Sequence, residues 1–365
     1  MRFLNSSRFL VRRAAGTLAL TALATTLVIS PAVAGQRGEP DRGTLVLTST
    51  NDPGGNQVVV FALKTGGAPA LSLRQTLPTG GKGGASGNAG ILQVREDLGA
   101  VANYGSNSVT ELVRDGDYLY VRGRIPLASG CNKPDSVALT GDQLFVTGAT
   151  CVESHAWPSG ALDGAVVHLS DPSAAQIAVG RSWGAVTMTS GSLLQVGLTA
   201  RGTLNGSAAP VALPGTANNA PLGAAFWGDI LGFNPAHSPD SFAIVDAQRN
   251  VYPVTGPTPS YPSNAPCWVA KGPGNVWYTG NSPGQAISIF FSDGKGGVFY
   301  KSVPVPGVPT DITVSPDRKW LAVIYTANDN GYVSVFAIDR YGDLTPEATS
   351  APIGVAAFSG VAISQ

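Results

Sequence analysis

The sequence is poor in charge, histidine, methionine and cysteine. Only 13% of its 365 residues are charged, and 23 basic residues balance 23 acidic ones to a formal net charge of zero. A protein without excess positive charge lacks the attraction that holds proteins on nucleic acid or on anionic membranes. We therefore exclude both as the main partner.

The sequence also lacks the motifs that mark several common chemistries. The three histidines show no His-x-His or His-x-x-x-His spacing, and the Asn-Asp turns near 51 and 328 lack the downstream acid of a calcium loop. No Gly-x-Ser-x-Gly elbow appears in a strand-to-helix context, and no Gly-Lys-Ser/Thr follows the glycine-rich stretch 80–90. We predict no metal or other cofactor, no serine hydrolase and no phosphate loop, and we interpret 80–90 as a mobile loop.

Residues 1–34 have the composition of a targeting segment. Four arginines precede the apolar stretch 14–30, and Ala32-Val33-Ala34 matches a small-residue cleavage site. We predict cleavage after Ala34 and a secreted or periplasmic mature chain that is not attached to a membrane. A retained anchor is the alternative, because the apolar stretch approaches a membrane-spanning length. The pair Arg12-Arg13 is compatible with twin-arginine export but does not decide the pathway.

Glycine and proline are abundant, with 46 and 27 residues, which favours many short strands and tight turns. The clearest example is Thr310–Asp339, where three runs of alternating β-branched and aromatic residues are separated by a Ser-Pro-Asp-Arg turn and an Asn-Asp-Asn-Gly turn. Three strands cannot bury both of their faces alone, so this unit must pack against others of its kind.

Similar units begin near residues 91, 134, 183, 221, 266 and 310. A spacing of roughly 40–50 residues is typical of the four-stranded blades of a β-propeller. The opening copy, 44–63, lacks its first strand, and one extra strand, GVAIS, stands at 360–364. We predict an all-β fold, a seven-bladed propeller in a single domain over residues 35–365, with the ring closed by pairing of the N- and C-terminal strands.

Four stretches resemble the lactonase-type seven-bladed propellers, the group of 6-phosphogluconolactonase and the 3-carboxymuconate lactonizing enzymes. They are Ala100–Val109, Pro134–Phe145, Ala265–Ala270 and Thr310–Asp339. The resemblance extends over the repeats of the whole mature chain. It implies a ligand site at the mouth of the central channel and hydrolysis of a lactone or similar cyclic ester.

Several positions that carry the chemistry of that family differ here. Where family members often have Pro-His, Pro134 is followed by Asp135; where they have Arg-His, this chain has Leu222-Gly223. The family's Asn-Glu is Asn234-Pro235, and Asn281 is followed by Ser282 instead of arginine. The substitutions predict little activity on carboxylated muconolactone or phosphogluconolactone, and they leave open whether the protein is an enzyme.

Other residues are candidates for a site. Glu153 and His155, expected in a loop, would form an acid–base pair, and Asn103 and Arg181 would act as donors to the oxyanion of an opening ester. The alternative is that His155 and His237 are solvated loop residues. Trp183, Trp227 and Trp268 fall near unit starts and are predicted to line the channel mouth, or else to fill space between blades.

Two functions follow from these patterns. The first is an exported, lactonase-like propeller that binds a small or oligomeric, sugar-like ligand at the channel mouth, with or without hydrolysis. The second is a non-catalytic scaffold that binds a protein or a surface polymer. The loss of the family's histidine, arginine and glutamate favours the second, whereas a cluster of an acid, a base and an arginine in one pocket would favour the first.

The three cysteines predict one disulfide. In an oxidising compartment a bond between Cys131 and Cys151 persists, and the two residues are placed symmetrically about a hairpin turn at Gly141-Asp142. Cys267 enters an apolar strand and is expected to remain a buried thiol. Three reduced cysteines are the alternative.

Overall fold

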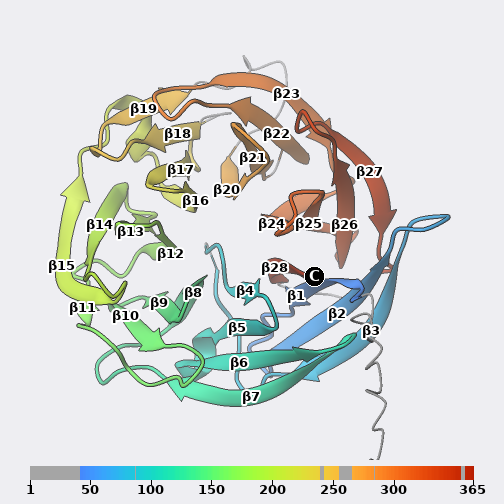
Figure 1. Cartoon of the computed structure of the whole chain (residues 1–365), viewed down its shortest axis with the longest axis horizontal. Coiled ribbons are helices and arrows are strands. Elements are labelled where there is room, and N and C mark those ends of the chain that lie inside the picture. The colour runs from blue at the N-terminus through green and yellow to red at the C-terminus, as the bar shows by residue number, and fades with distance from the viewer. Residues whose placement is uncertain (1–41, 87, 239–241, 255–264, 283, 355–357) are drawn as a thin grey trace, which may run out of the picture. The chain divides into compact units, whose positions relative to one another are not determined.

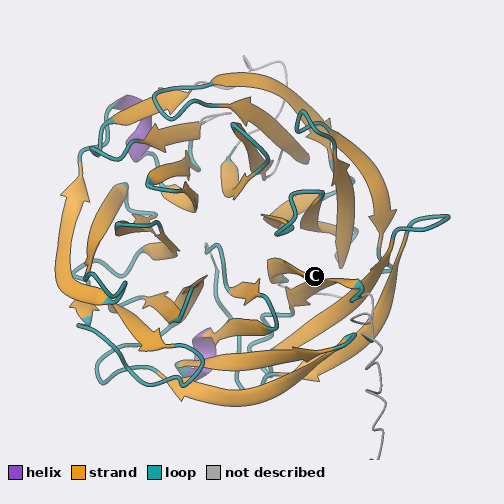
Figure 2. Cartoon of the chain, in the orientation of Figure 1, coloured by secondary structure: helices purple, strands orange, loops and turns teal. Residues whose placement is uncertain are grey.

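The computed structural model describes residues 42–86, 88–238, 242–254, 265–282, 284–354 and 358–365. These residues are almost entirely strands and the turns between them (Figure 2), and the described helices are two short 3-10 turns, η1 (Tyr104–Ser106) and η2 (Gly215–Asn218). Among these residues, no helix has the length and apolarity needed to cross a membrane. The predicted cleavage site after Ala34 lies outside the described residues.

Seven antiparallel sheets of four strands form a ring within Arg42–Gln365 (Figure 1), which confirms the predicted propeller. Blade 1 contains β28 (Ser359–Ser364), β1 (Thr44–Ser49), β2 (Gln57–Lys64) and β3 (Ala70–Pro78). Blade 2 contains β4 (Leu92–Arg95), β5 (Leu98–Asn103), β6 (Ser108–Asp115) and β7 (Tyr118–Pro126). Blade 3 contains β8 (Pro134–Thr140), β9 (Gln143–Gly148), β10 (Cys151–Ala156) and β11 (Val167–His168).

The remaining blades follow in chain order around the ring. Blade 4 contains β12 (Ala174–Val179), β13 (Trp183–Met188), β14 (Ser192–Leu198) and β15 (Leu204–Val211). Blade 5 contains β16 (Pro221–Trp227), β17 (Ile230–Pro235), β18 (Phe242–Val245) and β19 (Val251–Val254). Blade 6 contains β20 (Pro266–Lys271), β21 (Val276–Asn281), β22 (Ala286–Phe291) and β23 (Val298–Pro304). Blade 7 contains β24 (Val308–Val314), β25 (Trp320–Ala327), β26 (Asn330–Ile338) and β27 (Leu344–Thr349).

Blade 1 is assembled from both ends of the chain. Strand β28 pairs antiparallel with β1, which places Leu45 opposite Ser364 and Leu47 opposite Ala362, while the other edge of β1 pairs with β2. The predicted closure is therefore confirmed. It joins the first strand of the fold to the last, so the innermost position of blade 1 does not remain an unpaired edge.

Blade 3 and blade 4 differ from the predicted repeats. Blade 4 begins at β12, not at Trp183, which lies on the second strand. The segment CVESHA, predicted to be a loop, is strand β10, and only two residues form its outer partner β11. The buried glutamate, serine and histidine of β10 interrupt the apolar alternation by which a strand is recognised, so the sequence pattern concealed it.

Large side chains fill the spaces between neighbouring blades. Trp277 of blade 6 is fully buried and packs against Phe242 of blade 5, with ring centroids 5.5 Å apart. A Cβ atom at Gly232 would lie 2.5 Å from the Trp277 ring, so this position of β17 has no room for a side chain. Burial of each large apolar side chain stabilises the fold by roughly 1.5–3 kcal/mol.

Candidate functional site

The innermost strands β28, β4, β8, β12, β16, β20 and β24 surround the central channel. Residues from all seven line a cavity of about 350 Å³, here called the channel cavity. The first residues of β16, β20, β24 and β28 line a second space of about 430 Å³, here called the mouth pocket. The innermost strands thus begin at one end of the channel, and the mouth pocket lies at that end.

The mouth pocket is lined by neutral side chains. Its apolar surface comes from Leu222, Trp268 and Phe358, and its polar surface comes from small amide and hydroxyl groups such as those of Asn88, Thr310 and Ser359. No Asp, Glu, His, Lys or Arg is among the described residues that line it. A pocket of this composition suits an uncharged ligand with an apolar face and hydroxyl groups.

A short segment, Asn88–Gly90, lies across the channel; we call it the plug. Figure 1 shows the chain that leads into β4 running to the middle of the ring. Asn88 Nδ2 donates to the carbonyl oxygen of Asp135 in blade 3 (3.0 Å), and Asn88 Oδ1 accepts from Ser359 Oγ in blade 1 (3.3 Å). The Ala89 N–H donates to the carbonyl of Ala175 in blade 4 (3.2 Å). The plug therefore ties blade 1 to blades 3 and 4, neither of which follows it directly in the sequence.

Gly90 completes the plug, and no other residue fits its conformation well. Its carbonyl oxygen accepts the Val137 N–H (2.9 Å), and its φ of +70° lies in the left-handed region that favours glycine. A Cβ atom at this position would lie 3.0 Å from Gln176 Nε2 and 3.1 Å from Ser136 Oγ. The predicted mobile loop 80–90 is thus hydrogen-bonded to the blades, at Gly83 and Gly84 as well as in the plug.

Trp268 separates the two spaces. Its indole Nε1 donates to the carbonyl oxygen of Asn88 (3.3 Å), and its side chain lines both the mouth pocket and the channel cavity. Asn234 holds the backbone of Trp268 in place, since Asn234 Nδ2 donates to the Trp268 carbonyl oxygen (3.2 Å). The indole is consequently fixed at the base of the mouth pocket.

Asp135 is a buried carboxyl beside the plug. Only 6% of the residue is exposed, its Oδ1 has no hydrogen-bond partner, and burial raises its pKa to about 7 although Lys133 opposes the shift. Its backbone carbonyl binds Asn88, but the side chain does not line the mouth pocket among the residues described there. At the position where the lactonase-type family has histidine, this chain therefore has a carboxyl near the pocket rather than within it.

Glu153 and His155 form a pair, but at another place in the fold than predicted. Both lie on β10 rather than in a loop, two residues apart on one face, with His155 Nε2 3.1 Å from Glu153 Oε1. The other ring nitrogen, Nδ1, faces the carbonyl oxygen of Gly160 (3.0 Å) and therefore carries a proton. Glu153 Oε2 accepts the Ala128 N–H (2.8 Å).

This pair is remote from the channel. Strand β10 is the third strand of blade 3, separated from the channel by β8 and β9, and both side chains are at most 3% exposed. Burial raises the pKa of Glu111 in blade 2, and the charges of Arg122 and, to a lesser extent, His155 oppose that shift. The geometry is that of a buried polar link between blades 2 and 3. The other two histidines, 168 and 237, are exposed.

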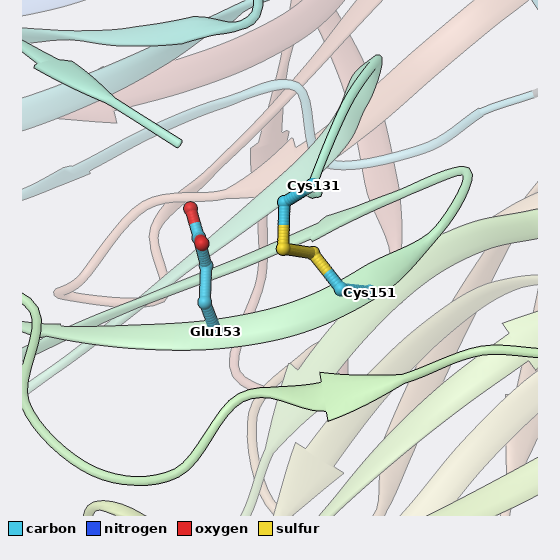
Figure 3. A group of neighbouring side chains, drawn as sticks. All are labelled: Cys131, Cys151 and Glu153. Atoms are coloured by element: carbon cyan, nitrogen blue, oxygen red, sulfur yellow. A yellow bond between two sulfur atoms is a disulfide. The ribbon is translucent and has the colours of Figure 1, made fainter. Parts of the chain in front are cut away.

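The predicted disulfide joins Cys131 to Cys151, with 5.5 Å between the Cα atoms (Figure 3). The hairpin of β8 and β9 turns at Gly141-Asp142, as predicted. The cysteines are not opposite residues of that hairpin, however. Cys131 precedes β8 and Cys151 begins β10, so the bond ties the open end of the hairpin. Cys267 is free and half-buried, and burial raises its pKa to about 12.

The disulfide also decides the chemistry of the one group of possible metal ligands in the described part of the chain. The sulfur atoms of Cys131 and Cys151 and a carboxylate oxygen of Glu153 lie within 4.8 Å of one another (Figure 3). Thiolates bind metal ions, and these sulfurs are bonded to each other instead. The oxidised protein therefore offers only Glu153 in this group.

The other predicted ligand residues are divided among different surroundings. Asn103 is fully buried and bonds Asn56, Thr79 and Thr110 between blades 1 and 2. Trp183 is 1% exposed, and the guanidinium of Arg249 covers its ring at 4.0 Å. Trp227 is 42% exposed and Arg181 is exposed too. Trp227 ends β16 and Arg181 follows the end of β12, so both lie at the end of the channel opposite the mouth pocket. Of the predicted set, only Trp268 lines the mouth pocket.

The residues that sequence reasoning missed are Asn88, Phe358 and Ser359. Each stands beside a predicted strand in a stretch of small or polar residues, with no motif around it. Only the closure of the ring brings them to Trp268. The position of 88–90 immediately before the first strand of a blade was the available signal, because such a segment must lie near the channel.

Comparison with solved structures supports the fold. A structure named “putative 6-phosphogluconolactonase” from Bacteroides uniformis aligns with a TM-score of 0.65 and 13% identity, over 89% of this chain and all of that one. A second structure of that name, from Bacteroides fragilis, aligns with a TM-score of 0.62 and 14% identity, over 90% of this chain and all of that one. The virginiamycin B lyase of Staphylococcus aureus aligns with a TM-score of 0.54 and 14% identity, over 78% of this chain and 92% of that one. No protein-family model and no curated protein matches the sequence.

The chain therefore shares the propeller fold of these structures. At 13–14% identity the likeness establishes the arrangement of the blades and does not transfer an activity.

Proposed function

We propose that this protein binds a small, uncharged, ring-shaped ligand at the mouth of its channel and does not transform it. The observation that carries the proposal is the lining of the mouth pocket. An indole and a phenyl ring offer flat apolar surfaces, and small amides and hydroxyls surround them, without a charged group among the described lining residues. Sugars and their neutral lactones present one apolar face and a rim of hydroxyl groups, which match this surface.

Hydrolysis has less support than binding. A water molecule that attacks an ester carbonyl needs a base within hydrogen-bond reach and a donor for the oxyanion. Among the described residues that line the mouth pocket, the one titratable group is the Cys267 thiol, and with a pKa of about 12 it stays neutral at physiological pH. Glu153 and His155 are buried in another part of blade 3.

Export of the mature chain belongs to the same proposal. The Cys131–Cys151 bond fits an oxidising compartment such as the periplasm or the cell exterior, where disulfides persist. A neutral ligand outside the cytoplasm is also consistent with a sugar or with part of a surface polymer.

Titration calorimetry with glucono-1,5-lactone and methyl glucoside tests the proposal. We expect saturable binding of both compounds, no acceleration of lactone opening above the buffer rate, and at least a tenfold loss of affinity in Trp268→Leu. The matched control is Trp227→Leu, which removes an indole at the other end of the channel and should leave the affinity unchanged. Lactone turnover at ordinary enzyme rates, roughly 1–1000 per second, would show that the protein is an enzyme instead.

One observation favours a protein-binding scaffold as the second candidate. Strands β3 and β7 lie side by side through two hydrogen bonds between Gln75 and Leu119, and Leu73, Tyr118 and Tyr120 on these strands are 61%, 49% and 51% exposed. Exposed aromatic groups on adjoining strands are common in protein interfaces. If neither sugar probe binds, this surface becomes the leading candidate for function.

A further inference from the structure

The channel cavity contains a buried carboxyl without a charged partner. Asp311, on the innermost strand β24, lines this cavity and is 5% exposed. The N–H groups of Ile312 (2.8 Å to Oδ1), Gly90 and Val361 donate to it, yet no cationic side chain of the described residues affects its pKa, which burial raises to about 7. Buried carboxylates in proteins are normally paired with a cation.

A guanidinium lines the same cavity further along the channel. Arg318 lies in the turn after β24, and its Nη1 donates to the carbonyl oxygens of Lys271 and Gly272. The residue as a whole is exposed, but partial burial of the guanidinium lowers its pKa, and no acidic side chain among the described residues influences that pKa. The adjacent Asp317 is engaged by Ser315, by the Lys319 N–H and by the Lys319 ammonium. Within the part of the chain that the structure describes, the Arg318 charge is therefore not matched by a carboxylate.

The two charges are separated along the channel axis. Asp311 lies beside the plug, and Arg318 follows the last residue of the strand, Val314. Three residues of extended strand span about 10 Å. Between the two charges the wall combines polar groups, such as the amides of Gln93 and Gln176, with apolar side chains such as that of Ile312. The volume of about 350 Å³ is that of a small-molecule site.

Lys271 also lines this cavity but does not supply a free charge to it. Its ammonium donates to the carbonyl oxygens of Gly272, Gly274 and Val276 at 2.7–3.1 Å, which uses all three of its protons. Arg318 is therefore the cation available to a ligand at this end, and Asp311 is the anion available near the plug.

We propose that the channel cavity binds a zwitterionic ligand of amino-acid or short-peptide size, with its ammonium group on Asp311 and its carboxylate on Arg318. This site is distinct from the mouth pocket, from which Trp268 and the plug separate it, and it does not depend on the proposed sugar binding. Each end of the ligand would satisfy a charge that the fold leaves unmatched. The apolar side chains between the charges, such as those of Ile312 and Val314, would contact the carbon chain.

The test is calorimetric titration at pH 8 with three probes of the same chain length: 6-aminohexanoate, hexylammonium and hexanoate. We expect 6-aminohexanoate to bind about 10–100-fold more tightly than either singly charged probe, because each charge-assisted contact contributes roughly 1.5–3 kcal/mol. Equal affinities for the three probes, or no binding of 6-aminohexanoate at millimolar concentrations, would overturn the proposal.

Variants assign each end of the ligand. Arg318→Gln, in an exposed turn, should weaken 6-aminohexanoate to the affinity of hexylammonium and leave hexylammonium itself unchanged. Asp311→Asn should weaken 6-aminohexanoate and hexylammonium and leave hexanoate unchanged. Lys319→Gln, one residue from Arg318 and outside the cavity lining, is the matched control and should change nothing. If Arg318→Gln binds all three probes like the wild type, the assignment of the carboxylate end is wrong, whether or not Asp311→Asn folds.

Discussion

The indole nitrogen of Trp268 donates a hydrogen bond to the carbonyl oxygen of Asn88, a residue 180 positions earlier in the chain. Blade 6 is thereby tied to the segment that leads into blade 2. The contact forms the base of the mouth pocket and one side of the channel cavity, so the stability of the ring and the shape of both sites depend on it.

The plug is expected to stabilise the ring. Asn88→Ala removes the buried hydrogen bonds to the Asp135 carbonyl and to Ser359 Oγ, and it leaves both groups without these partners. We expect the free energy of unfolding to fall by about 2–4 kcal/mol, measured by urea denaturation. Asn205→Ala, on the exposed outer strand β15, is the control and should cost less than about 1 kcal/mol. Equal effects of the two variants would contradict a structural role for the plug.

Loss of the closing strand should open the ring. A chain that ends at Phe358 lacks β28, and with it the pairing to β1 and the innermost strand of blade 1. We expect a steep fall in the melting temperature and exposure of the β1 edge, visible as aggregation. A truncated chain that melted like the full protein would show that closure contributes little.

The disulfide should stabilise the folded protein because it closes a loop in the unfolded chain. Replacement of both Cys131 and Cys151 by alanine opens a loop with a sequence separation of 20 residues, which predicts a loss of about 3 kcal/mol in the free energy of unfolding. Peptide mapping without reduction should find the 131–151 link and a free thiol at Cys267. A link that contains Cys267 would contradict the structure.

Stability should fall as pH rises from about 4 to about 8. Burial raises the pKa of Asp135 and of Asp311 from 3.8 to about 7, so between these values the folded protein holds protons that the unfolded chain has released. Each of these carboxyls stabilises the folded protein by up to about 4 kcal/mol. This stabilisation is fully present below the pKa of the unfolded chain and is lost as the pH rises through the pKa of the folded protein. Asp135→Asn should flatten the profile of melting temperature against pH. A wild-type profile that is flat or rises over this range would refute the assignment.

The fold was predictable because its signals are local and repeated. The strands of Thr310–Asp339 and the lone strand at 360–364 alternate clearly, and their spacing gave both the number of blades and the closure. Blade 3 was harder to predict, because the buried polar residues of β10 give it a sequence pattern typical of a loop. There the pairing of β10 with β9 and β11 overrides the local pattern.

The site was much less predictable, because it is built from residues distant in sequence. Trp268 was identified from its place at a unit start. Asn88 and Asp311 have ordinary local sequences, and only the ring brings them to the channel. Asn103 and Trp183 had the right residue types for a ligand site, but packing between the blades uses them instead.

A crystal structure of the protein grown with glucono-1,5-lactone tests the central claim most directly. The account predicts density for an intact, uncharged ring in the mouth pocket, stacked on Trp268 and near Phe358, with its hydroxyls within hydrogen-bond reach of Asn88, Thr310 or Ser359. An empty mouth pocket at saturating ligand, or a bound ring with a carboxyl group such as that of Asp135 turned toward its ester carbonyl, would contradict the claim of binding without chemistry.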